Sequence, residues 1–377
     1  MTFSRAIQVS ATVSTTALPT TLQSTVIYDG VTFTLDRQMP VGVDELGEPF
    51  VVSDQAFSIT SVSPASQVVN GAWTNGLMID PYIHPDTKNA GNHQGFDEFL
   101  SMGTGSLSAA NIPYTHSLNR DVATQGAIAV GLGQSMSLVK SVRLGTVNSS
   151  DQWQTIEKYV TLSVVPFYPR VGWFRAGASA TDKTGMIVNL NLSALRSVIL
   201  PGSFPKTPAA AIADVPTSLG LFGAIGEQLR RLRLDKTKGT SNTNYSADVS
   251  DAYGMALMAL HASNLAMADR AAFARRCIRF ALDVKGLADR GSSLSAGAGQ
   301  GLGIGVWLYA GAFLTNSAAM LTAARALDTQ TTSARWVQAS EVGRATAQRS
   351  GGYNAQTFFE EHVDMPFVVP DLYLSLI

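Results

Sequence analysis

The first half of the chain takes its architecture from one run of residues: Val26-Ile27-Tyr28-Asp29-Gly30-Val31-Thr32-Phe33-Thr34-Leu35. From Val31 to Leu35, apolar and polar residues alternate, as in a strand with one buried face. Asp29-Gly30, between Val26-Ile27-Tyr28 and Val31, is typical of a two-residue hairpin turn, because both residues tolerate a positive φ. The run therefore predicts a β-hairpin.

The same alternation continues outward from this hairpin. Further strands are expected at residues 56–62, 135–142 and 158–165, and Gly47-Glu48-Pro49 is a second turn signal. Residues 9–25 are rich in Ser, Thr, Ala and Val, which fits either an arm lying along a neighbour or an edge strand with its loop. Short strands at this spacing predict a β-sandwich-like region, or a small barrel-like sheet stack, over residues 1–200. Residues 75–97 are expected to form its long loop, a position where function often resides.

The second half of the chain changes to helical periodicity. The Pro-rich residues 201–215 read as a linker, and residues 216–377 as an α-helical domain. Helices are expected to begin at Pro216, at Ser250 and at Asp269 as an N-cap, the last running to about Leu287. Two more are expected at residues 303–327 and 333–348. Consecutive amphipathic helices suggest a bundle or part of an α/α toroid, which makes the whole chain α+β.

Composition points to a protein whose surface is covered by other subunits. Charged residues make up 15% of the 377, against roughly 25% in ordinary soluble domains. The chain ends in an apolar stretch that we expect to be buried in a neighbouring subunit of a homo-oligomer. The predicted interface residues are Leu372, Tyr373, Leu374 and Ile377. The alternative is a plain monomer rich in Gly, Ala and Ser.

The sequence argues against several other classes. The 27 basic and 28 acidic residues leave no basic footprint for nucleic acid. No apolar run reaches the length of about 18 residues that would insert in a membrane. Cys277 stands alone, which excludes an intrachain disulfide. A hydrolase elbow (Gly-x-Ser-x-Gly) and the phosphate-loop motif are both missing, so no catalytic residue and no cofactor is expected.

Two acidic clusters carry alternative interpretations. His84 and His93 share a loop with four carboxylates, Asp80, Asp86, Asp97 and Glu98, where a loose metal site competes with turn residues capping their own backbone. Their spacing matches no tight metal motif, so turn capping is favoured and no metal is expected. Near the C-terminus, Glu360, Glu361 and Asp364 flank His362. Such carboxylates suit glycoside cleavage, but they are also normal on a solvated turn.

Aromatic residues with polar neighbours suggest contact with a glycan. Flat rings stack on sugars while nearby polar side chains bind hydroxyl groups, although packing in the core is the commoner role of such rings. The candidate glycan-binding residues are Trp173, Arg175, Asp182, Tyr253, His261, Trp307 and Tyr309. The enzyme alternative, a polysaccharide lyase or hydrolase on a β plus α/α scaffold, would place Tyr253, His261 and Tyr309 together in one cleft.

Three stretches resemble structural proteins of phages and related gene-transfer particles: Asn75-Gly76-Leu77-Met78-Ile79-Asp80-Pro81, Gln94-Gly95-Phe96-Asp97 and the Ser/Thr-rich start. The resemblance implies a virion component such as a tail, baseplate or spike protein, made in the host cytoplasm. Its partners would be other virion subunits, and host attachment would bring contact with a cell-surface polysaccharide. The likeness carries over no individual site residue.

Overall fold

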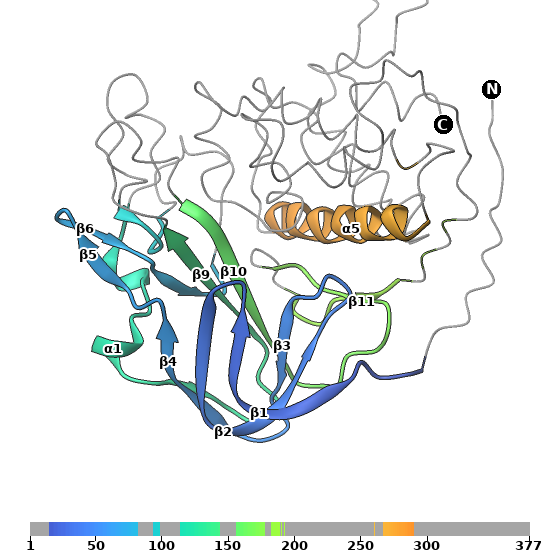
Figure 1. The fold of residues 1–377 in the computed structure, drawn as a ribbon, viewed down its shortest axis with the longest axis horizontal. Coiled ribbons are helices and arrows are strands. Elements are labelled where there is room, and N and C mark those ends of the chain that lie inside the picture. Colours follow the sequence, from blue (N-terminus) through green and yellow to red (C-terminus); the bar gives the residue numbers. More distant parts are fainter. Residues whose placement is uncertain are drawn as a thin grey trace, which may run out of the picture.

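The computed structural model describes residues 15–81, 93–98, 114–143, 156–177, 182–188, 190, 192, 260 and 267–289 (Figure 1). Strand residues clearly outnumber helical residues here, so this part of the protein is mainly β. The strands are β1 (Thr20–Tyr28), β2 (Val31–Val43), β3 (Pro49–Val52), β4 (Phe57–Ser63), β5 (Gln67–Val69), β6 (Ala72–Thr74), β7 (Leu77–Ile79), β8 (Ile128–Val130), β9 (Met136–Arg143), β10 (Ile156–Val165), β11 (Trp173–Phe174) and β12 (Met186–Ile187). The helical segments are η3 (His116–Leu118), α1 (Val122–Gln125) and α5 (Met267–Asp289).

The predicted hairpin is confirmed as β1 and β2. Asp29 and Gly30 form its turn with φ values of 52° and 78°, so both central residues adopt the positive φ that such a tight hairpin requires. Tyr28 pairs with Val31 directly across the turn. The expected strands at 56–62, 135–142 and 158–165 correspond to β4, β9 and β10.

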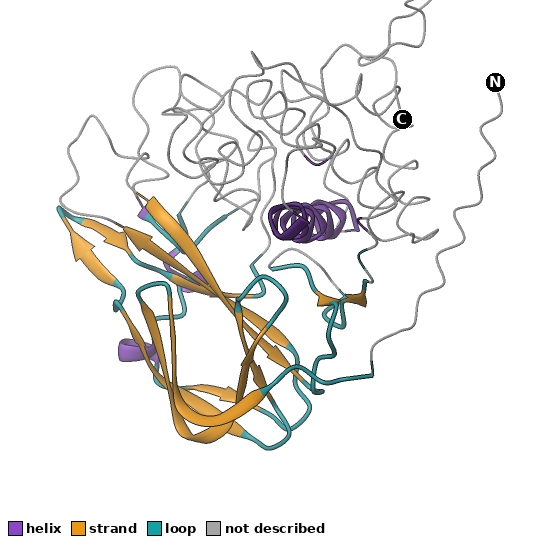
Figure 2. Ribbon diagram, turned by 45° about the vertical axis from the view of Figure 1, so that its right-hand side comes forward, coloured by secondary structure: helices purple, strands orange, loops and turns teal. Residues whose placement is uncertain are grey.

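Strand β2 causes the sheet to curl. Its first half pairs with β4 and its second half with β3, and β1 pairs with both halves along the opposite side. Between the halves, the exposed residues Asp36, Arg37 and Gln38 interrupt the register. The strand order is β7-β9-β10-β3-β2-β4-β8, with β1 off this path, and Figure 2 shows the resulting half-barrel.

The hollow of the half-barrel holds the main hydrophobic core. Apolar side chains from one face of β2 meet those of β4, β9 and β10, and the largest of them are fully buried. Its central members are Val31, Phe33, Leu35, Ile59, Leu138, Val160 and Leu162. A smaller cluster of Phe50, Val52, Val165 and Trp173 lies on the other face of β3 and β10.

The predicted fold class is wrong in two respects. A sandwich needs two stacked sheets, whereas here the bend in β2 lets one sheet curl around a single core. Within the described part of the predicted helical domain, α5 is the one extended helix, and no bundle is formed. The helix expected from Asp269 to Leu287 exists but begins at Met267, so Asp269 does not cap it.

Other predicted elements lie in parts of the chain that the structure does not describe. The linker at 201–215 and the helices expected from Pro216, from Ser250, at 303–327 and at 333–348 lie outside the described residues. Part of the expected loop at 75–97 is ordered as β7. Among the helices in the described ranges, none combines the length and apolar character needed to cross a bilayer.

Candidate functional site

The outer edge of β1 is an exposed edge of the sheet in the part of the chain that the structure describes. β1 pairs with β2, and among the described residues no strand pairs with its other side. Most of its residues from Thr21 to Ser24 are exposed, and Leu22 and Ile27 are 63% and 73% exposed. An edge of this kind presents unpaired backbone N–H and C=O groups to any strand that approaches.

Three features that commonly prevent strand pairing, namely short length, charge and proline, are missing from β1, although its register is irregular between Gln23 and Thr25. Natural edge strands are blunted by short length, charge or proline. The other two ends of the sheet, β7 and β8, have three residues each, whereas β1 has nine. Its sequence, TTLQSTVIY, contains neither a charged residue nor a proline. The length and chemistry of β1 therefore favour pairing with another chain.

The segment that leads into β1 is held in place by the rest of the domain. The Leu18 N–H donates to the Pro169 carbonyl at 2.7 Å, and the Val171 N–H donates to the Thr16 carbonyl at 3.0 Å. Along its inner side, β1 is bonded to β2 from Thr20 to Tyr28. β1 is thus already ordered before a partner binds, so that pairing would cost little conformational entropy in β1.

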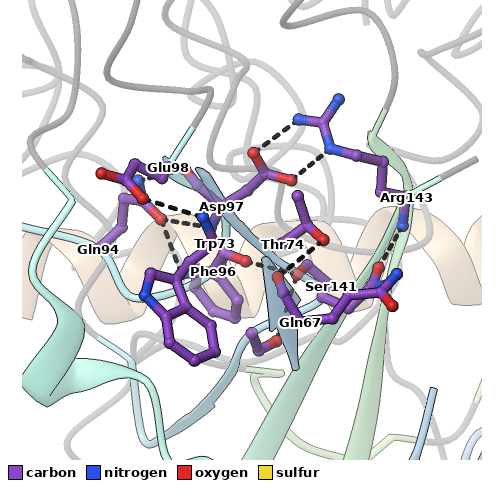
Figure 3. Close-up of polar contacts among 11 residues, drawn as sticks. Gln67, Trp73, Thr74, Gln94, Phe96, Asp97, Glu98, Ser141 and Arg143 are labelled. Carbon is purple, nitrogen blue, oxygen red and sulfur yellow. Dashed lines mark hydrogen bonds and ion pairs between the residues drawn. The ribbon is translucent and has the colours of Figure 1, made fainter. Parts of the chain in front are cut away.

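A buried ion pair fixes the segment around residue 97 to the outer face of β9 (Figure 3). The Arg143 guanidinium donates to both oxygens of Asp97, from Nε and from Nη2, each at 2.6 Å. The Arg143 backbone N–H donates to Asn75 Oδ1 at 2.8 Å, and the Ser141 hydroxyl donates to the Phe96 carbonyl at 3.0 Å. This network holds Asn75, Asp97 and β9 together below the surface, so it serves as scaffold.

Comparison with known proteins adds no family to this geometry. No protein family, curated protein or solved structure matches the chain.

Three of the predicted glycan-binding residues can be placed. Trp173 is buried, in edge contact with the rings of Phe50 and Phe167, and its Nε1 donates to the Thr184 carbonyl at 2.8 Å. Arg175 is buried as well, and burial lowers its pKa to about 10. Asp182 belongs to an exposed turn.

The contacts of Arg175 and Asp182 are internal. Arg175 donates to the Val164 carbonyl and to the Ser137 hydroxyl, each at 2.8 Å. Asp182 accepts from the backbone N–H of Thr184 at 2.8 Å. These contacts fit the packing alternative for Trp173 and Arg175. Tyr253, His261, Trp307, Tyr309 and the predicted interface residues Leu372, Tyr373, Leu374 and Ile377 lie outside the described residues, so those predictions stay predictions.

The carboxylates proposed for the long loop are used as caps and ion pairs. Asp80 accepts from the Ser137 N–H at 2.7 Å, Asp97 binds Arg143, and Glu98 accepts from the Trp73 N–H at 2.9 Å. His93 shares a hydrogen bond with the Thr115 hydroxyl at 2.6 Å. Within the described ranges, no three metal-ligating side chains gather. His84, Asp86 and the Glu360–Asp364 cluster lie outside them.

Lys140 is a buried lysine that sequence reasoning missed. It lies on β9 in phase with Met136 and Leu138, on the core face, and is 1% exposed. Its Nζ has no hydrogen-bond partner among the described residues. Burial lowers its pKa to about 7, and the charge of Asp121 opposes that shift. In the sequence, the burial of Lys140 is indicated by its position two and four residues after the apolar Leu138 and Met136, which places all three on the same face of the strand.

Helix α5 is attached to the β2–β3 turn by ion pairs. Arg279 contacts Glu48 at 2.7 Å and Asp44 at 3.6 Å, and Arg275 contacts Glu45 at 3.2 Å. Burial, followed by repulsion from Glu48, raises the pKa of Asp44 to about 7. Since the folded state therefore holds a proton that the unfolded state releases above about pH 4, the Asp44 carboxyl lowers the free energy of unfolding as the pH rises from about 4 toward 7.

Proposed function

We propose that the protein is a structural subunit of a larger assembly and that it joins a neighbouring subunit through β1. The observation that carries this proposal is the long, uncharged edge of that strand, beside which no other described strand lies. Strand addition at such an edge gains main-chain hydrogen bonds, while exposed side chains such as Leu22 and Ile27 add apolar contact. The low charge of the chain as a whole also supports a protein with much of its surface covered.

The setting we propose for this assembly is a phage-like particle. Its support is the resemblance of residues 75–81, 94–97 and the Ser/Thr-rich start to structural proteins of such particles. The protein would then act as a tail, baseplate or spike component. The enzyme alternative depends on Tyr253, His261 and Tyr309, which the structure does not describe.

Substitution of Ile27 by lysine is expected to break up the assembly. A lysine on an edge strand opposes pairing with a second strand, because its charge would have to be desolvated or placed against the partner. Light scattering of the full-length protein should show an oligomer for the wild type and a lower mass for Ile27→Lys.

The matched control for this substitution is Leu132→Lys. Leu132 is 72% exposed, against 73% for Ile27, but it lies in the turn between β8 and β9. Leu132→Lys should keep the mass of the wild type. A wild-type protein that is monomeric at all accessible concentrations would contradict the proposed function.

Glycan contact is a second candidate, favoured by one surface feature. The ring of Trp73, on β6, packs on the exposed ring of His116 with 4.4 Å between centroids, and Tyr114 lies 6.3 Å from His116. Partly exposed aromatic rings with polar neighbours can stack on sugars. This cluster fits such a role better than the buried Trp173.

Oligosaccharides are expected to quench tryptophan fluorescence through Trp73. The quenching should disappear in Trp73→Phe, a variant that keeps a ring for packing, and persist in His93→Ala at the margin of the cluster. Equal quenching in wild type and Trp73→Phe would remove this candidate.

A further inference from the structure

We infer that β1 pairs antiparallel with β1 of a second copy of this chain, so that one sheet continues across a two-fold axis. This inference rests on the proposed function, because it names the partner that occupies the edge.

The two exposed apolar residues of β1 share one face of the sheet. Leu22 is opposite Pro40 and Ile27 is opposite Thr32, both on the face of β2 that points away from the core. Val26 is opposite Phe33 and therefore faces the core. The register irregularity between Gln23 and Thr25 is what brings residues an odd number apart onto the same face.

This arrangement selects a register for the two-fold pair. Directly opposite residues in an antiparallel ladder lie on the same face. If Leu22 lies opposite Ile27 of the second copy, then Ile27 lies opposite Leu22 of that copy, and each exposed apolar side chain covers the other. In the same register Gln23 lies opposite Val26, and both face the core side. In this register, each pair of opposite residues, Leu22 with Ile27 and Gln23 with Val26, therefore lies on the same face of the continued sheet.

The charge of β1 also favours a second copy as the partner. A two-fold contact places each patch against itself, so a charged strand would meet its own charge. β1 contains no charged residue, and its exposed polar residues Thr21, Gln23 and Ser24 can both donate and accept hydrogen bonds. Self-pairing thus leaves no like charges opposite one another along this strand.

Cysteine cross-linking of the full-length protein tests the register. Single variants Leu22→Cys and Ile27→Cys are prepared, oxidised mildly both alone and as a mixture, and run on non-reducing gels. Opposite residues in the pair have Cα atoms about 4.5–5.5 Å apart, which is within disulfide reach. Two copies of the same position are offset by five residues, or roughly 17 Å, which is too far. The native Cys277 is buried, and the wild type provides the background.

The expected result is a cross-linked dimer in the mixture at a level at least about tenfold above that of either variant alone, because only mixed pairs are in reach. An oligomer in which each variant cross-links with itself would overturn this antiparallel register, and an oligomer in which no combination cross-links would overturn the β1–β1 pairing. Either result leaves the proposed function standing. A monomeric wild type in light scattering would overturn both. Since Leu22 and Ile27 are exposed, neither substitution is expected to prevent folding.

Discussion

Replacing Asp97 by asparagine is expected to lower the free energy of unfolding by about 3–5 kcal/mol, because it removes a charged, bidentate carboxylate from a buried guanidinium. Side-chain exposure in this pair is 0% for Asp97 and 2% for Arg143, so water cannot take the place of the lost charge. The two 2.6 Å contacts are also lost as charge-assisted bonds. Chemical denaturation followed by tryptophan fluorescence measures the change.

The control for this substitution is Asp36→Asn. Asp36 pairs with Arg37 on the surface, where solvent screens the interaction, and the unfolding midpoint should stay close to that of the wild type. A double exchange, Asp97→Leu with Arg143→Met, removes both charges and should recover much of the loss. If Asp97→Asn were no less stable than Asp36→Asn, the network of Figure 3 would not be the scaffold of this region.

The parts of the fold that were predicted correctly depend on neighbouring residues. Alternation and the Asp29-Gly30 turn identified the β1–β2 hairpin, since the pairing of Tyr28 with Val31 is purely local. Helical periodicity likewise identified α5 to within two residues at each end. For residues 20–25, the edge-strand alternative was confirmed.

The curl of the sheet was missed because it depends on distant pairings. β10 pairs in parallel with β3, with Ser163 opposite Phe50, and no local pattern encodes that contact. The buried pair of Asp97 and Arg143 spans 46 residues. In the sequence, Asp97 is one of several loop carboxylates, and the residues near it give no indication of a guanidinium partner.

Substitution of Lys140 by methionine is expected to stabilise the protein, in contrast to Asp97→Asn. The wild type buries an amine of pKa about 7, against a usual 10.5, without a hydrogen bond to its Nζ among the described residues. At one pKa unit per roughly 1.4 kcal/mol, Lys140→Met should raise the free energy of unfolding near pH 7 by on the order of 4 kcal/mol. Methionine keeps the unbranched shape of lysine and fills the same space.

The pH dependence of this gain provides a sharper test than its size. Between about pH 7 and pH 10.5 the unfolded wild type keeps the Lys140 proton while the folded state has released it, so the stability of the wild type rises with pH in that interval. The advantage of Lys140→Met should therefore be greatest below pH 7 and narrow steadily toward pH 10. Lys183→Met, at a partly exposed lysine that pairs with Asp80 at 3.1 Å, should show no such gain. A constant difference between Lys140→Met and the wild type from pH 6 to pH 10 would mean that Lys140 stays protonated in the folded protein, which requires an anionic partner beside it.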